Sequence, residues 1–213
     1  MSKTLTIDFY HDVVCGWCFN ISPRLRQLAG KFSLNVQHRA FVLQRNREDM
    51  VTAWGSLPRA KKIILGHWEA CRNASDTPEL FNIEGMRRAT FEYPFGLPAA
   101  LACKAAERIG GQHAHWQIFD LLQSAHLTQT RNIADANIVL EVAEATGFDR
   151  HEFNQVMSDP ETRLAVDADL LMSRRFQVKS VPTLIVRETG ARLVNGPVED
   201  LRAQLVAAHR LNA

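Results

Sequence analysis

The stretch HDVVCGWCFN, residues 11–20, contains two cysteines, Cys15 and Cys18, separated by Gly16 and Trp17. Two cysteines at this spacing can bind a metal, form a redox-active disulfide, or lie buried as small apolar side chains. The local structure around the pair and the residues found elsewhere in the chain distinguish these three uses.

The pair lies where a strand changes into a helix. Before it, Leu5, Ile7 and Phe9 alternate with polar residues, which is typical of a β-strand. After it, apolar residues follow helical spacing, with Pro23 inside the first turns. Residues 34–41 alternate again. The chain therefore opens β-α-β, which predicts a right-handed crossover and two parallel strands.

This position gives the two cysteines different tasks. At the start of the helix, Cys15 meets unpaired backbone N–H groups and the positive end of the helix dipole, which stabilise a thiolate. Cys18 follows one turn later, close enough for a disulfide of ordinary geometry. We expect Cys15 to be the exposed attacking thiol and Cys18 the more buried resolving thiol. Gly16 and Trp17 are expected to contact the substrate, since they leave the loop uncharged and provide a flat apolar face.

No metal and no organic cofactor are predicted. Tetrahedral zinc needs four ligands, and neither a second C-x-x-C nor a suitably spaced histidine pair follows the first. Cys71 and Cys103 stand alone in predicted helices, and His113 and His115 are only two positions apart. Cys71 and Cys103 are expected to be buried thiols, with a second redox pair as the alternative.

The rest of the chain reads as a long helical block followed by a second small α/β unit. Residues 46–176 are predicted to be helical, and strands at 183–186 and 191–194 precede a closing helix at 198–209. We therefore predict an α/β fold of two halves, βαβ and ββα. Residues 1–45 and 177–213 would form the sheet domain, and residues 46–176 an inserted all-helical domain.

Within the helical block, turn and capping residues predict the helix ends. One helix is expected inside residues 47–73, and others run over 97–109 and 112–126, separated by Gly110–Gly111. Later starts are expected at Asn132, Asp149 and Asp159–Pro160. The helix after Asp159 is expected to bury four apolar residues, namely Leu164, Ala168, Leu171 and Met172.

The sequence KSVPTLIV, residues 179–186, places Val181–Pro182 directly before a strand. A cis bond here would form a tight turn that exposes the backbone of Val181 to an extended substrate opposite Cys15. The alternative is a trans proline that simply opens an edge strand. We predict the cis form, with Val181 and Pro182 binding substrate.

Three polar residues lie just before the cysteine pair. Asp8 could move the proton of Cys18 if the carboxyl is buried, or it could face water. A charged His11 could stabilise the Cys15 thiolate. Asp12 would oppose that thiolate, and it is expected to cap local backbone instead.

Composition places limits on the partners. The chain has 213 residues, of which 46% are hydrophobic, and a net charge of +2 without a basic run. Nucleic acid and membrane partners are therefore not expected. No export signal is visible, which predicts a cytoplasmic protein, where a cysteine pair is more often catalytic than structural.

Several aromatic residues are expected in the core of the insertion or along its groove: Trp54, Trp68, Trp116, Phe91, Tyr93 and Phe95.

Taken together, these motifs resemble the thioredoxin fold, and the inserted helices resemble its DsbA-like branch. The stretches that are similar to FrnE-like cytosolic dithiol oxidoreductases are DFYHDVVCGWC (8–18), GLPAALACKAAERIGG (96–111), IADANIVLEVAEATGFD (133–149) and SVPTLIV (180–186). The resemblance implies Cys15 as nucleophile, Cys18 as resolving thiol and Pro182 as the cis-proline opposite them. The sequence departs from the FrnE-like pattern in two places. Gly16 stands where these proteins usually have Pro, and residues 95–103 lack the Asn-Thr…Ala-His motif that they tend to carry.

The predicted function is thiol–disulfide exchange with protein or low-molecular-weight substrates through the C-G-W-C dithiol. Two alternatives stay open. One is a glutathione-dependent enzyme similar to kappa transferases or hydroxychromene-carboxylate isomerases, with glutathione as co-substrate. The other is a binding or chaperone-like module whose cysteines are incidental. The oligomeric state and the direction of electron flow are not predicted.

Overall fold

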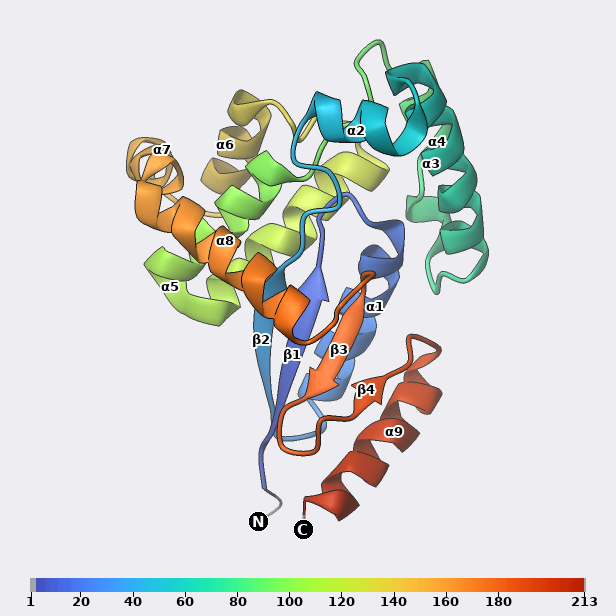
Figure 1. Ribbon diagram of the computed structural model, residues 1–213, viewed down its shortest axis with the longest axis vertical. Helices are drawn as coiled ribbons and strands as arrows, with labels where there is room; N and C mark the ends of the chain where they lie inside the picture. The colour runs from blue at the N-terminus through green and yellow to red at the C-terminus, as the bar shows by residue number, and fades with distance from the viewer. Residues whose placement is uncertain (1–2, 213) are drawn as a thin grey trace.

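The computed structural model describes residues 3–212 and places a four-stranded sheet beneath a layer of helices (Figure 1). The strands are β1 (Leu5–His11), β2 (Leu34–Ala40), β3 (Thr183–Val186) and β4 (Arg192–Leu193), in the order β2-β1-β3-β4. β1 pairs parallel with β2 and antiparallel with β3. The predicted βαβ and ββα halves therefore share one mixed sheet.

Helices of the insertion gather above the strands, while α9 lies beside β4 near the two chain ends (Figure 1). The elements before the insertion and at its start are α1 (Gly16–Ala29), α2 (Arg47–Trp54), α3 (Leu57–Asn73), the 3₁₀ turn η1 (Pro78–Leu80) and α4 (Ile83–Arg88). The later elements are α5 (Leu97–Gln123), the π-helical turn η2 (Ser124–Thr128), α6 (Ala136–Ala145), α7 (Arg150–Ser158), α8 (Pro160–Arg175) and α9 (Val198–Leu211).

Polar side chains begin most of the insertion helices. Asn46, Ser56, Asp135, Asp149 and Asp159 each accept a hydrogen bond from a backbone N–H in the first turn of the helix that follows. Such caps satisfy donors that have no partner inside the helix. The predictions at Asp149 and Asp159 are confirmed.

The helix expected inside residues 47–73 is confirmed as α3. Another helix, α2, precedes it and ends where Gly55 takes φ +87°. One predicted helix boundary is wrong. The helix expected to start at Asn132 starts instead after Asp135. The Asn132 carboxamide oxygen accepts from Ala134 N in a preceding turn, and the Asp135 carboxylate caps α6.

The predicted apolar face of α8 is also wrong. Leu164 and Leu171 are exposed, and the buried face carries Val166, Asp169 and Ser173. Asp169 is buried because it is paired with two cations from other elements, and this pairing sets the rotation of the helix. Apolar spacing alone could not show that a carboxylate would face the core.

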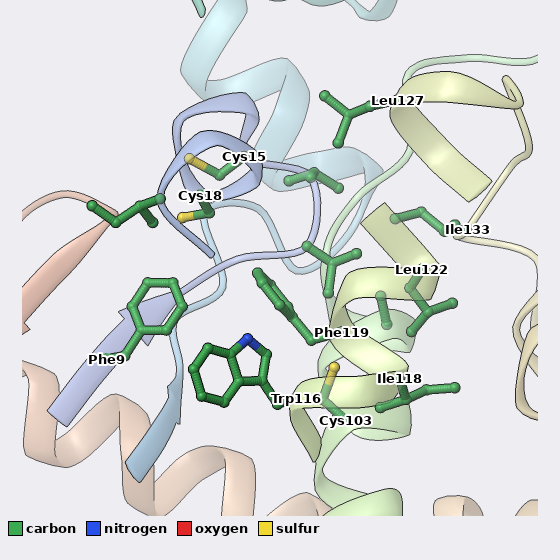
Figure 2. Packing of buried hydrophobic residues seen from close by; sticks show 14 of the residues in the cluster. Phe9, Cys15, Cys18, Cys103, Trp116, Ile118, Phe119, Leu122, Leu127 and Ile133 are labelled. Carbon is green, nitrogen blue, oxygen red and sulfur yellow. The ribbon is translucent and has the colours of Figure 1, made fainter. Parts of the chain in front are cut away.

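The main hydrophobic core joins the sheet to the insertion. Phe9 of β1, Cys18 of α1 and Phe119 of α5 belong to one buried cluster (Figure 2). Within the described residues, no helix is both long enough and apolar enough to cross a membrane.

Candidate active site

The two cysteines of the C-G-W-C motif lie at the start of α1. Cys15 is the N-cap residue, with extended backbone angles, and its carbonyl accepts hydrogen bonds from the N–H groups of Cys18 and Phe19. The sulfurs of both cysteines lie on the same side of this turn (Figure 2). The backbone thus takes the predicted strand-to-helix form.

The two thiols differ in burial, but less than expected. Cys18 is fully buried, and Cys15 is only 8% exposed, whereas Trp17 is 37% exposed. The expectation of an exposed Cys15 is therefore wrong for this conformation. The sulfur is covered because it lies 3.5 Å from the carbonyl oxygen of Val181, to which its S–H donates. Burial raises the pKa of Cys18 well above its usual value, and the neighbouring Cys15 raises it further.

The peptide bond between Val181 and Pro182 is cis. The Val181 carbonyl lies over the Cys15 sulfur, although the two residues are 166 positions apart in the chain. The loop before β3 and the start of α1 therefore meet at one place, as an exchange site would require.

Asp12, not Asp8, is the carboxyl beside the dithiol. Asp12 is buried and accepts hydrogen bonds from the backbone N–H groups of Leu43, at 2.7 Å, and Val14, at 3.2 Å. Burial raises its pKa to about 6, although these N–H groups lower it. Its charge acts on the Cys18 thiol. Asp12 therefore caps local backbone, as expected, and in addition titrates near neutral pH.

The structure places Asp8 on the other face of the sheet. Successive side chains of a strand point to opposite faces, so Phe9 faces Cys18 while Asp8 faces away. Asp8 forms ion pairs with Arg39 at 2.8 Å and Arg187 at 2.6 Å. Burial raises its pKa, but these arginines outweigh burial and leave the pKa lowered. The predicted proton shuttle at Asp8 is therefore corrected: the carboxylate is an ion-pair partner.

His11 does not have the role that was expected for it. Its ring packs against Phe9 and Phe119 and contacts two other buried histidines. Burial, followed by the charge of His115, lowers its pKa well below the usual value. A neutral ring in the core cannot supply the positive charge that was expected to stabilise the Cys15 thiolate.

The insertion holds the loop that carries the dithiol. The side-chain amide of Gln123 donates to the carbonyls of Val13 and Cys15, and the Tyr93 hydroxyl donates to the carbonyl of Val14. No sequence signal marks Gln123, because it lies 108 positions from Cys15 inside a long helix. Tyr93 was expected only as an apolar wall.

Cys71 of α3 packs against the same loop. A Cβ atom added at Gly16 would lie 3.0 Å from the Cys71 sulfur and 3.2 Å from the ring of Phe81. The glycine that replaces the usual proline therefore leaves room for this thiol. Burial raises the pKa of Cys71 to about 12, and the neighbouring Cys15 contributes. Cys103 is buried on α5, away from Cys15 and Cys18 (Figure 2).

A groove of about 390 Å³ opens beside Cys15, between the dithiol loop and α3. Its lining includes Trp17, Trp54, Trp68, Tyr93 and Val181. The expectation that aromatic residues of the insertion line such a groove is confirmed for Trp54, Trp68 and Tyr93. A larger hollow of about 650 Å³ lies under α8, where Asp8 and Arg39 line it, but it contains no cysteine.

Curated relatives match most of this chain but extend well beyond it. The chain is 28% identical over 184 residues to the ClpXP adapter protein SpxH of Bacillus subtilis, covering 85% of this chain and 58% of that protein. The corresponding protein of Bacillus licheniformis is 26% identical. The chain thus spans somewhat more than half the length of these relatives.

Solved structures share the fold over almost the whole chain. A candidate protein disulfide isomerase from Nitrosomonas europaea gives a TM-score of 0.81 at 20% identity, covering 99% of this chain and 100% of that one. The cytosolic disulfide reductase DsbM of Pseudomonas aeruginosa gives 0.74 at 23% identity, covering 97% and 100%. The model of the family described as DSBA-like thioredoxin domain matches residues 6–206. This chain therefore belongs to the DSBA-like thioredoxin domain family.

Proposed function

We propose that the protein is a thiol–disulfide oxidoreductase that exchanges disulfides through Cys15 and Cys18. One observation carries the proposal: Cys15 begins α1 with its sulfur at the Val181 carbonyl, and a buried Cys18 follows one turn later. An apolar groove adjoins Cys15, which suits an extended apolar segment of a substrate protein.

The exchange proceeds in two steps. The Cys15 thiolate attacks one sulfur of a substrate disulfide, forming a mixed disulfide and releasing the other substrate sulfur as a thiolate. Cys18 then loses its proton and attacks the Cys15 sulfur, which releases the second substrate thiol and leaves a Cys15–Cys18 disulfide. The reverse sequence transfers a disulfide to the substrate.

Asp12 is the proposed proton acceptor for the second step. Cys18 must lose its proton in a buried place where a thiolate is unfavourable, so a nearby base lowers the barrier. A carboxyl with a pKa of about 6 can take up a proton near neutral pH. Asp8 is not proposed as a proton acceptor, because its ion pairs with Arg39 and Arg187 stabilise the charged carboxylate.

Substitution of the cysteines tests the mechanism. Insulin reduction and reshuffling of scrambled ribonuclease should be lost in Cys15→Ala. Cys18→Ala should accumulate mixed disulfides, seen by mass spectrometry without reductant, because no thiol resolves them. Cys103→Ala is the matched control, since that thiol lies away from the site. Full exchange activity in Cys15→Ala would contradict the proposal.

Two other functions give different results in the same assays. A glutathione-dependent enzyme, suggested by the DsbM structure solved with glutathione, would need glutathione and tolerate Cys18→Ala. A protein-binding adapter role is favoured by the SpxH relatives and by exposed apolar residues on α8, Leu164 and Leu171. Adapter activity would survive substitution of both cysteines. We place the protein in the cytoplasm, supported by the fold that it shares with the cytosolic disulfide reductase DsbM.

A further inference from the structure

Three histidine side chains meet in the core beside the dithiol loop. His11 comes from the end of β1, His38 from β2 and His115 from α5, and all three are buried. Nε2 of His11 lies 3.1 Å from Nδ1 of His38 and 3.2 Å from Nε2 of His115. One ring nitrogen from each residue lies within 4.8 Å of the other two, so the three nitrogens converge on one point.

The spacing of the rings matches that of three imidazoles around one tetrahedral metal. With metal–nitrogen distances of about 2.0–2.1 Å, neighbouring ring centres lie roughly 5 Å apart. The observed distances between ring centres are 5.1 Å for His11–His38, 5.2 Å for His11–His115 and 4.8 Å for His38–His115. Three side chains packed only by shape have no reason to direct a nitrogen each to a common centre.

Hydrogen bonding alone does not satisfy this cluster. The Nδ1–H of His115 donates to Glu107 at 2.7 Å, so a neutral ring presents a bare Nε2 to His11. Nε2 of His11 faces a nitrogen of each of the other two rings. A single proton on this Nε2 can be donated to only one of them. On their far sides, Nδ1 of His11 and Nε2 of His38 have no hydrogen-bond partner among the described residues. A cation at the centre would use all three converging lone pairs.

The surroundings supply what a metal site needs. His11, His38 and His115 are all fully or almost fully buried, so few waters compete for their converging ring nitrogens. The contact between Glu107 and His115 is the carboxylate–histidine pair that orients a metal-binding ring. The nearby Lys104 ammonium is paired with two carboxylates, Glu107 and Asp169, so its charge is compensated.

We propose that His11, His38 and His115 bind a divalent metal ion of the zinc type that ties β1, β2 and α5 together next to the dithiol. Neutral imidazoles suit zinc and its neighbours rather than magnesium or calcium, which prefer oxygen ligands. The site is independent of the exchange proposed for Cys15 and Cys18. Ligand spacing along the chain could not reveal it, because each histidine comes from a different element.

Metal content tests the proposal directly. The full chain and its Cys15→Ser/Cys18→Ser variant are equilibrated with zinc, passed through gel filtration and assayed for bound metal by mass spectrometry. We expect one equivalent in both proteins and in His113→Gln, whose exposed side chain lies two residues from His115. His38→Gln should retain none. Absence of metal from the full chain, its loss with the cysteines, or its retention in His38→Gln would each overturn the proposal.

Cobalt substitution keeps the test decisive if His38→Gln fails to fold. Co²⁺ bound by the Cys15→Ser/Cys18→Ser variant should show the visible bands of a tetrahedral nitrogen site without a thiolate charge-transfer band. A thiolate band, or the weak spectrum of hydrated Co²⁺, would overturn the proposal. Because this readout does not depend on disulfide exchange, it separates the metal site from the proposed function.

Discussion

At the scale of single residues, Asp8 and Asp12 show how two carboxyls close together in the sequence come to lie in opposite environments, Asp8 within β1 and Asp12 directly after it. Asp8 faces Arg39 and Arg187, which lower its pKa. Asp12 lies in the core, where burial raises its pKa to about 6. Both residues were visible in the sequence, but the burial of Asp12 and the arginines that reach Asp8 from distant segments decide which carboxyl has the raised pKa and which the lowered one.

Replacing Asp12 should change how stability depends on pH. In the folded protein its pKa of about 6 lies above the ordinary value of 3.8, so its contribution to stability is fully present below pH 3.8 and is lost as the pH rises through 6. The free energy of unfolding of Asp12→Asn minus that of the wild type should therefore increase by about 2 kcal/mol between pH 4 and pH 7. Urea unfolding across this range measures the difference. Parallel curves would show that Asp12 does not titrate as expected.

The absence of a side chain at Gly16 makes room for the Cys71 sulfur, so substitutions at these two positions should be coupled. Because a Cβ at Gly16 would press on the Cys71 sulfur, Gly16→Ala should destabilise the wild type by about 1 kcal/mol. In a Cys71→Ala background the same change should cost less, because the sulfur is gone while the Phe81 ring stays 3.2 Å away. A double-mutant cycle from chemical unfolding gives the coupling, and additive effects would contradict the packing between them.

At the scale of elements, the long α5 is two helices joined at Gly110–Gly111. Gly111 has φ +70° and ψ −164°, a backbone conformation open to glycine and strained for other residues. The sequence predicted this interruption from the two glycines. It matters for the site because the first half of α5 carries Glu107 while the second carries His115 and Gln123.

Two alanine substitutions distinguish this glycine from an ordinary helical one. Gly111→Ala should destabilise the protein by about 1–3 kcal/mol, since alanine is strained at this φ and ψ. Gly66→Ala in the interior of α3, where a Cβ meets open space, should stabilise it by about 1 kcal/mol. Thermal and urea unfolding compare the two. Equal effects would mean that the backbone at Gly111 is not constrained.

At the scale of the whole molecule, ion pairs connect the sheet to the insertion. Asp169 of α8 lies 2.8 Å from Lys104 of α5 and 3.3 Å from Arg39 of β2, and it accepts from the backbone N–H of Ala40 at 2.9 Å. Arg39 also forms an ion pair with Asp8 of β1. Three elements far apart in sequence thus depend on one buried carboxylate.

Neutralising Asp169 should therefore cost far more than neutralising an exposed carboxylate of the same helix. Asp169→Asn leaves Lys104 without one of its two carboxylates, which we expect to destabilise the protein by about 3–5 kcal/mol. Asp167→Asn is the matched control, because its half-exposed pair with Arg163 is worth under about 1 kcal/mol. Chemical unfolding of both variants checks this, and similar losses would show that the buried network is not stabilising.

The sequence by itself determined the order of elements, the strand-to-helix junction at Cys15 and the place of Val181–Pro182 directly before a strand. These features depend on local spacing, on turn residues and on the backbone preferences of glycine and proline, all of which can be read along the chain. Only the tertiary structure decided that Asp12 lies beside Cys18, that Gln123 holds the dithiol loop, that Cys71 occupies the space left by Gly16, and that three histidines converge. Each of these depends on which faces of distant elements pack together, and burial and opposing charges, not spacing, set those faces.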